Sequence, residues 1–115
     1  MALGVIRRGD ICLVNFAPAR ASEADYIRPA VIVTNNAANA QNVVITVVPL
    51  ITNVERVYHF QLLLPNGRTG LEHDSKAQVE QIRNVALSRV IKRLGQVPAD
   101  LMQELDGKIR PHLAL

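Results

Sequence analysis

The hydrophobic positions of this chain fall in short runs rich in β-branched residues, and turn-forming residues separate the runs. Residues 30–34 and 43–50 are nearly continuous Val and Ile, which is typical of strands buried on both faces. Residues 11–16 are predicted to form an earlier strand, ahead of these two runs. Residues 57–64 predict a fourth strand, ended by the turn Pro65-Asn66-Gly67. The first half of the chain therefore indicates a β protein.

The second half continues this pattern with shorter segments. Apolar and polar residues alternate over residues 77–83, which predicts a half-exposed strand. Residues 87–90 predict a single helical turn, and residues 91–97 predict another short strand. Residues 35–42 show no apolar helical face, so we expect a plain connecting loop there.

The C-terminus differs in kind, because its apolar residues recur at helical spacing. Pro98 suits the first turn of a helix, and Asp100 complements the positive end of the helix dipole. Pro111 should end or kink this helix. Five or six short strands and one terminal helix predict an α+β fold, a small and partly open β-barrel. One helical face carries Leu101, Met102, Leu105 and Ile109.

Composition narrows the function classes. A chain of 115 residues predicts one domain, residues 1–115. Cys12 lies in an apolar run and predicts a small core residue rather than a nucleophile. The sequence shows no signal peptide, no membrane span of about 18 apolar residues and no metal or nucleotide motif. We therefore expect a cytoplasmic protein without cofactor, metal site or membrane attachment.

Charge and aromatic content indicate the kind of partner. A net charge of +3 favours an anionic partner. Only two Phe, two Tyr and no Trp are present, which argues against a platform that stacks several bases.

The loops carry the candidate chemistry. Residues 17–27 join two strands by more residues than a turn needs, and they lead into Arg28 and Pro29. Pro29 holds Arg28 extended at the rim of the core. From spacing alone, Arg28 is either an anion-binding group or a rim arginine paired with Glu23 or Asp25.

A series of short motifs follows in a fixed order: Arg8-Gly9-Asp10-Ile11, Ser22-Glu23, Arg28-Pro29, Val48-Pro49 with Thr52, Gly70-Leu71, Asp74-Ser75, Gln81-Ile82-Arg83 and Leu94-Gly95. In this order and spacing they resemble the MazF/PemK family of bacterial toxins, the ribonuclease half of toxin–antitoxin modules. The resemblance runs from about Arg8 to Leu115. It implies the SH3-like barrel with a C-terminal helix of the CcdB/PemK-like toxin fold, acting as a homodimer.

The resemblance also implies an activity. It implies metal-independent, sequence-selective cleavage of single-stranded RNA, usually messenger RNA, which arrests translation. A MazE-like antitoxin would inhibit the protein by laying an acidic tail over the RNA groove. The basic residues Arg83, Arg89, Lys92 and Arg93 offer such a tail a surface, or they form an ordinary solvated face.

Site residues are carried over position by position. The catalytic arginine falls on Arg28 and the catalytic threonine on Thr52, with Glu23 as a base or orienting group. In two places the chain departs from the family pattern. Ala21 stands where glycine is usual, and Thr52 comes one residue late, so that either the loop is longer or Ile51 takes the usual place. The residues expected to contact RNA are Ser22, Tyr26, Asn53, Asp74, Ser75 and Arg83, with Tyr26 the one candidate for stacking.

The residues suit metal-free RNA cleavage. The ribose 2′-hydroxyl attacks the phosphorus and leaves a 2′,3′-cyclic phosphate and a 5′-hydroxyl. The Arg28 guanidinium can hold two phosphate oxygens, and Thr52 can donate a hydrogen bond to them. Two alternatives remain open: a gyrase-poisoning toxin of the CcdB type, and a non-catalytic RNA-binding barrel.

Overall fold

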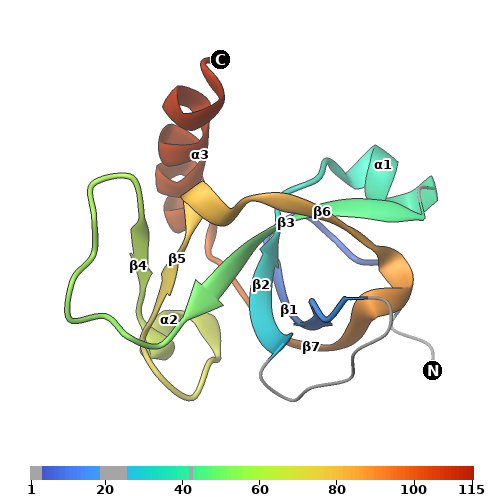
Figure 1. Ribbon diagram of the computed structural model, residues 1–115, viewed down its shortest axis with the longest axis horizontal. Helices are drawn as coiled ribbons and strands as arrows, with labels where there is room; N and C mark the ends of the chain where they lie inside the picture. The colour runs from blue at the N-terminus through green and yellow to red at the C-terminus, as the bar shows by residue number, and fades with distance from the viewer. Residues whose placement is uncertain (1–3, 19–25, 42) are drawn as a thin grey trace.

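A computed structural model describes residues 4–18, 26–41 and 43–115 (Figure 1). The described chain is an α+β structure in which one curled antiparallel sheet is followed by a long helix. The strands are β1 (Asp10–Asn15), β2 (Ile27–Ile32), β3 (Val44–Ile51), β4 (Leu62–Leu64), β5 (Ser75–Ala77), β6 (Arg83–Ala86) and β7 (Val90–Gln96). The helices are α1 (Asn36–Gln41), α2 (Asn66–Thr69) and α3 (Ala99–Leu113), and the 3₁₀ turns are Val79–Gln81 and Leu87–Arg89.

Strand β3 is the centre of the sheet. The strand order is β4-β5-β3-β2-β1-β7, and β6 pairs with the first half of β3. The second half of β3 pairs with β2 and then with β5, so that the sheet bends along this one strand. In Figure 1, β6 and β7 curve round β1 and β2, passing above them, to their right and below them. The prediction of a small, partly open barrel with a C-terminal helix is confirmed.

Alternation along the strands divides the interior into two cores. On one face of the sheet, Ile11, Val31 and Val48 pack against α3. On the other face, Cys12 and Ala30 belong to a second cluster inside the curl. The near-continuous apolar runs of β2 and β3 are therefore explained, because both faces of these strands are covered. The predicted apolar face of the helix is confirmed, because Leu101, Met102 and Leu105 are buried in the first core and Ile109 packs against it.

Helix α3 does not end at Pro111, which was one of the two outcomes predicted for this proline. It runs through Pro111 to Leu113 rather than stopping at the proline. A proline at this position removes the hydrogen bond to the carbonyl of Gly107. Gly107 and Pro111 are both exposed, so water can bind the freed carbonyl. The helix therefore tolerates the loss of this hydrogen bond. No helix in the described ranges is long and apolar enough to cross a membrane.

Four predicted segments were wrong in extent or type. Residues 35–42 contain helix α1, because the Asn35 side chain accepts a hydrogen bond from the Ala38 amide at 2.8 Å and starts the helix without an apolar face. Strand β2 spans Ile27–Ile32 rather than 30–34. Pro29 is accommodated because β2 pairs with β3 only from Ala30 onward.

The other two segments lie between β3 and β6. Of residues 57–64 only Leu62–Leu64 form a strand, because a turn from Tyr58 to Gln61 interrupts the extended chain. The predicted strand 77–83 is instead the end of β5, a 3₁₀ turn and the start of β6. The two strands pair with different halves of β3, and the turn carries the chain between them.

Candidate functional site

A pocket of about 440 Å³ opens beside the start of β2. Arg28 lies one residue into this strand, opposite Val14 of β1, and its side chain is exposed at the pocket. The amide of Phe16 donates to the carbonyl of Tyr26 at 2.9 Å, which closes the base of the segment between β1 and β2. The pocket is lined by Phe16, Tyr26, Arg28, Pro49, Gln78, Gln81 and Arg83. We call it the Arg28 pocket.

The Arg28 pocket holds two guanidinium groups and no acidic lining residue. The Arg83 Cζ lies 5.3 Å from the centre of the Phe16 ring, a cation–π contact that positions the second guanidinium. Within the described residues, neither Arg28 nor Arg83 has a carboxylate within 4.0 Å. The pocket is therefore suited to an anion such as a phosphodiester. The alternative pairing of Arg28 with Glu23 or Asp25 lies outside the described residues.

Thr52 lines a different pocket, of about 490 Å³, which we call the Thr52 pocket. Its wall is formed where the end of α2 approaches β7. A Cβ on Gly95 would lie 2.0 Å from the carbonyl oxygen of Thr69, so only glycine allows this approach. Its lining residues are Leu13, Pro29, Thr52, Gly70, Leu71, Glu72, His73, Ser75, Lys92, Arg93 and Leu94.

The two pockets open on opposite faces of the sheet. Leu13 pairs with Pro29, and both line the Thr52 pocket. Ala30 pairs with Pro49 on the other face, which Arg28 shares because strand residues two apart point the same way. The same alternation in β3 places Ile51, not Thr52, on the face of Arg28. The structure therefore groups Tyr26 and Arg83 with Arg28, and Ser75 with Thr52.

The remaining predicted site residues have local partners or lie outside the described chain. The Asn53 side chain accepts a hydrogen bond from the Glu55 amide at 3.2 Å, and the Asp74 side chain accepts one from the Asn66 amide at 2.9 Å at the start of α2. Neither residue lines the two pockets. Ser75 is buried, and its hydroxyl donates to the carbonyl of His73 at 3.3 Å. Ser22 and Glu23 lie outside the described residues.

Two of the four residues of the predicted basic surface bind other groups of the protein itself. Arg89 donates to the carbonyls of Asn15 and Ala17, at 3.1 and 2.5 Å. Arg93 pairs with Asp10 at 3.0 Å. Only Arg83 and Lys92 of the four have no such partner among the described residues. Two of the four arginines and lysines therefore support the fold directly.

Cys12 is 1% exposed, as predicted for a core residue. Burial first, and the nearby charge of Asp10 second, raise the pKa of the Cys12 thiol to about 11. The thiol is therefore protonated near neutral pH and is a poor nucleophile. Across residues 4–18, 26–41 and 43–115, no three His, Cys, Asp or Glu side chains are close enough to hold a metal ion.

Four residues that line the Arg28 pocket were not among the predicted site residues: Phe16, Pro49, Gln78 and Gln81. Phe16 resembled the last core residue of a strand, and only the position of Arg83 above its ring shows its second role. The two glutamines were assigned to a half-exposed strand. The 3₁₀ turn that brings them to the pocket leaves no periodic signal in the sequence.

Comparison with known proteins assigns the family. The model of the PemK-like, MazF-like toxins of type II toxin–antitoxin systems matches residues 7–113. An endoribonuclease of Mycobacterium tuberculosis, MazF9, is 47% identical over 116 residues, covering 96% of this chain and 98% of that protein.

Solved structures agree in fold. The crystal structure of MazF from Deinococcus radiodurans superposes with a TM-score of 0.80 at 25% identity, covering 97% of this chain and 99% of the other. A mycobacterial endoribonuclease in complex with its cognate antitoxin superposes with a TM-score of 0.74 at 18% identity. That comparison covers 96% of this chain and 95% of the other.

Proposed function

This chain belongs to the PemK-like, MazF-like toxins of type II toxin–antitoxin systems and is a MazF-like endoribonuclease toxin. We propose that it cleaves single-stranded RNA without a metal ion. The substrate is messenger RNA in the cytoplasm, and its cleavage arrests translation. Residues 1–115 form one toxin domain that works as a homodimer and is inhibited by a MazE-like antitoxin. One observation carries the proposal: the Arg28 pocket holds two guanidinium groups and no acidic lining residue.

The reaction is a transesterification within the RNA. The ribose 2′-oxygen forms a bond to the adjacent phosphorus, and the bond from phosphorus to the 5′-oxygen breaks. A 2′,3′-cyclic phosphate and a 5′-hydroxyl result. The proton leaves the 2′-hydroxyl for a base, and another proton reaches the 5′-oxygen.

Arg28 stabilises the charge that develops on the pentavalent phosphate. Its planar guanidinium donates to two phosphate oxygens at once, which supplies the positive charge that the transition state requires. A guanidinium is a poor base because it stays protonated in proteins. Glu23 is the proposed base or orienting group. Thr52 donates its hydroxyl to a phosphate oxygen of the same strand from the neighbouring pocket.

RNA recognition uses groups around the two pockets. Tyr26, 41% exposed at the edge of the Arg28 pocket, stacks on a base, and Arg83 binds a second phosphate. Hydrogen bonds to the bases come from Ser22, and from Asn53 and Asp74, which line neither pocket. The Ser75 hydroxyl, which already donates to the His73 carbonyl, accepts from a base in the Thr52 pocket.

The test is incubation of the purified protein with single-stranded RNA in EDTA. Cleavage that leaves 5′-hydroxyl ends supports the proposal. Arg28→Ala should lower the rate by about 10³-fold, the cost of removing one transition-state donor, while the thermal midpoint stays within a few degrees. The matched control is Arg68→Ala, which removes a guanidinium that pairs with Asp100 on the exposed surface. Wild-type cleavage by Arg28→Ala would exclude Arg28 from the mechanism.

The two alternatives give other results in the same experiment. Intact RNA together with inhibited DNA gyrase would indicate a toxin of the CcdB type. RNA that is bound but left intact would indicate a non-catalytic RNA-binding barrel.

A further inference from the structure

An aromatic and cationic cluster lies on the segment between β3 and β4, away from the Arg28 pocket. The rings of Tyr58 and Phe60 stack with centres 5.4 Å apart and planes 8° from parallel. His59 meets Phe60 edge-on at 5.3 Å. Two of the four Phe and Tyr residues of the chain are therefore gathered in one exposed segment.

Two cations lie over the Tyr58 ring. The Arg56 Cζ is 4.8 Å from the ring centre, and the Lys76 Nζ is 5.8 Å from it. Within the described residues, neither has a carboxylate within 4.0 Å. Two like charges on one ring repel each other, so an anion between them would be bound favourably.

The burial of Lys76 further favours the binding of an anion at this cluster. Its side chain is only 7% exposed, yet its ammonium donates to a single acceptor among the described residues, the Arg56 carbonyl at 2.6 Å. An ammonium has three donors, and burying it without a counter-charge is costly. A phosphate that accepts from Lys76 and Arg56 would offset that cost.

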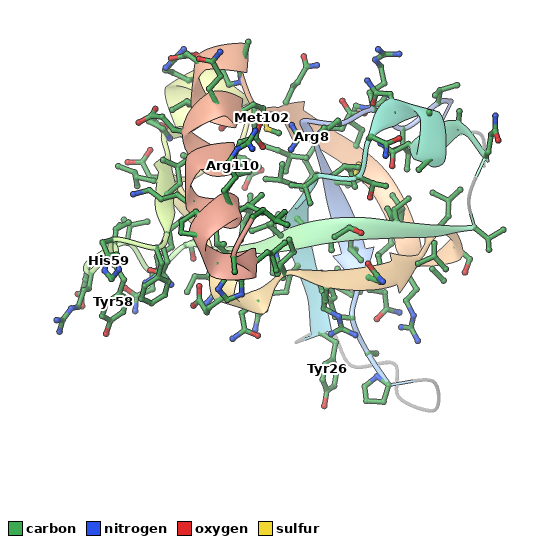
Figure 2. The ribbon with its side chains drawn as sticks, turned by 90° about the horizontal axis from the view of Figure 1, so that it is seen from above. Arg8, Tyr26, Tyr58, His59, Met102 and Arg110 are labelled. Atoms are coloured by element: carbon green, nitrogen blue, oxygen red, sulfur yellow. The ribbon has the colours of Figure 1, made fainter. Side chains whose placement is uncertain are left out.

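This cluster is on the same face of the sheet as Arg28. Ile51 pairs with Lys76, and Leu63 pairs with Lys76 on its other side, so the three share one face. Ile51 shares the face of Pro49 and Arg28 by strand alternation. Figure 2 shows Tyr58 beside His59 at the left of the molecule and Tyr26 at its lower end. From β2 to β5 is two strand spacings, about 10 Å.

We infer that Arg56, Tyr58 and Lys76 form a second contact site for the substrate RNA, which the strand reaches after crossing β3 and β5 from the Arg28 pocket. The inference rests on the proposed ribonuclease function. RNA is favoured over an acidic peptide, because a base can stack on the exposed Arg56 guanidinium that the Tyr58 ring supports, while phosphates contact the two cations. A peptide carboxylate would use the cations alone.

The test measures binding of a mixed-sequence single-stranded RNA that is 2′-O-methylated throughout and therefore cannot be cleaved. The variants are Arg56→Gln, Lys76→Met and Tyr58→Leu. The control is Arg110→Gln, which removes an exposed charge from α3. Each cation removed should lower the slope of log K against log salt by about 0.7, the value for one phosphate contact on a single strand. Tyr58→Leu should weaken binding about tenfold, the size of one stacked base.

Cleavage kinetics give an independent readout. The same variants should raise KM for cleavable RNA, with kcat within twofold of the wild type, because the contact is made equally in ground and transition states. Lys76→Met should not lower the thermal midpoint, since it removes a buried charge.

Three outcomes decide the inference. Unchanged salt slopes in Arg56→Gln and Lys76→Met would overturn it. Variants that lose binding of an acidic peptide but keep binding of RNA would assign the cluster to a protein partner and also overturn it. A wild-type protein that leaves RNA uncut, but binds it with slopes that depend on Arg56 and Lys76, would contradict the proposed function while supporting this site.

Discussion

Arg28 and Thr52 lie on opposite faces of the sheet, each in its own pocket, although both were expected at a single catalytic centre. The relationship follows from strand alternation, because Pro29 shares the Thr52 pocket and Pro49 shares the Arg28 pocket. An RNA strand that meets both residues therefore passes over the end of the sheet where β2 begins and β3 ends, and the two side chains contact different phosphates.

If Arg28 and Thr52 contact separate phosphates, their mutations should have additive effects on the activation free energy of cleavage. Arg28→Lys and Thr52→Val should each lower single-turnover cleavage, and the double variant should lower it by the product of the two losses. The measurement is a double-mutant cycle on one RNA substrate. A double variant no worse than Arg28→Lys alone would place both side chains on the same phosphate.

Arg83 should act through binding rather than chemistry. Phe16→Leu removes the ring above which the Arg83 guanidinium lies, so the cation loses its fixed position. We expect both Phe16→Leu and Arg83→Gln to raise KM, with a kcat close to that of the wild type. Steady-state kinetics at low and high salt check this. An equal fall in kcat for Arg83→Gln would instead assign Arg83 to the transition state.

Arg89 should hold in place the residues that follow β1, at the start of the segment between β1 and β2. Its guanidinium donates to two carbonyls at and just after the end of β1, those of Asn15 and Ala17. Losing these bonds should cost about 1.5–3 kcal/mol, as for hydrogen bonds to a charged group. Arg89→Gln should therefore lower both stability and kcat/KM.

Fluorine NMR separates positioning by Arg89 from a loss of stability alone. The chain has two tyrosines, so protein labelled with fluorotyrosine should give two resonances. In Arg89→Gln the Tyr26 resonance should shift and the Tyr58 resonance should not. The control is Arg8→Gln, which also removes guanidinium bonds, to Val33 and Asp106. Unchanged Tyr26 and Tyr58 resonances in Arg89→Gln would show that Arg89 only stabilises the fold.

Burial of the Cys12 thiol should make the fold less stable at alkaline pH. Burial raises the pKa of its thiol from 9.0 to about 11, so the unfolded chain loses this proton first as the pH rises. The unfolded state then binds fewer protons than the folded state, and stability falls between pH 9 and pH 11, by about 2–3 kcal/mol in total. Urea unfolding of the wild type and Cys12→Ala across this range isolates the effect. Parallel pH profiles for the two proteins would contradict it.

Local patterns predicted much of the fold correctly. The Val and Ile run of β3 is a strand because its residues suit a pleated backbone covered on both sides. The helical spacing of Leu101, Met102 and Leu105 predicted the apolar face of α3 for a similar reason. By contrast, α1 was missed because it depends on an asparagine cap, and β4 was overextended because a turn interrupts a run that is apolar only in part.

The sequence by itself determined the family, the strands with strong β-branched runs, the terminal helix and the position of Arg28 before Pro29, because each depends on neighbours along the chain. Only the tertiary structure decided that β3 pairs with three strands and that Thr52 faces away from Arg28. It alone placed Lys76 over the ring of Tyr58. These features depend on strand pairing between distant residues, in which a shift of one residue reverses the face of every side chain.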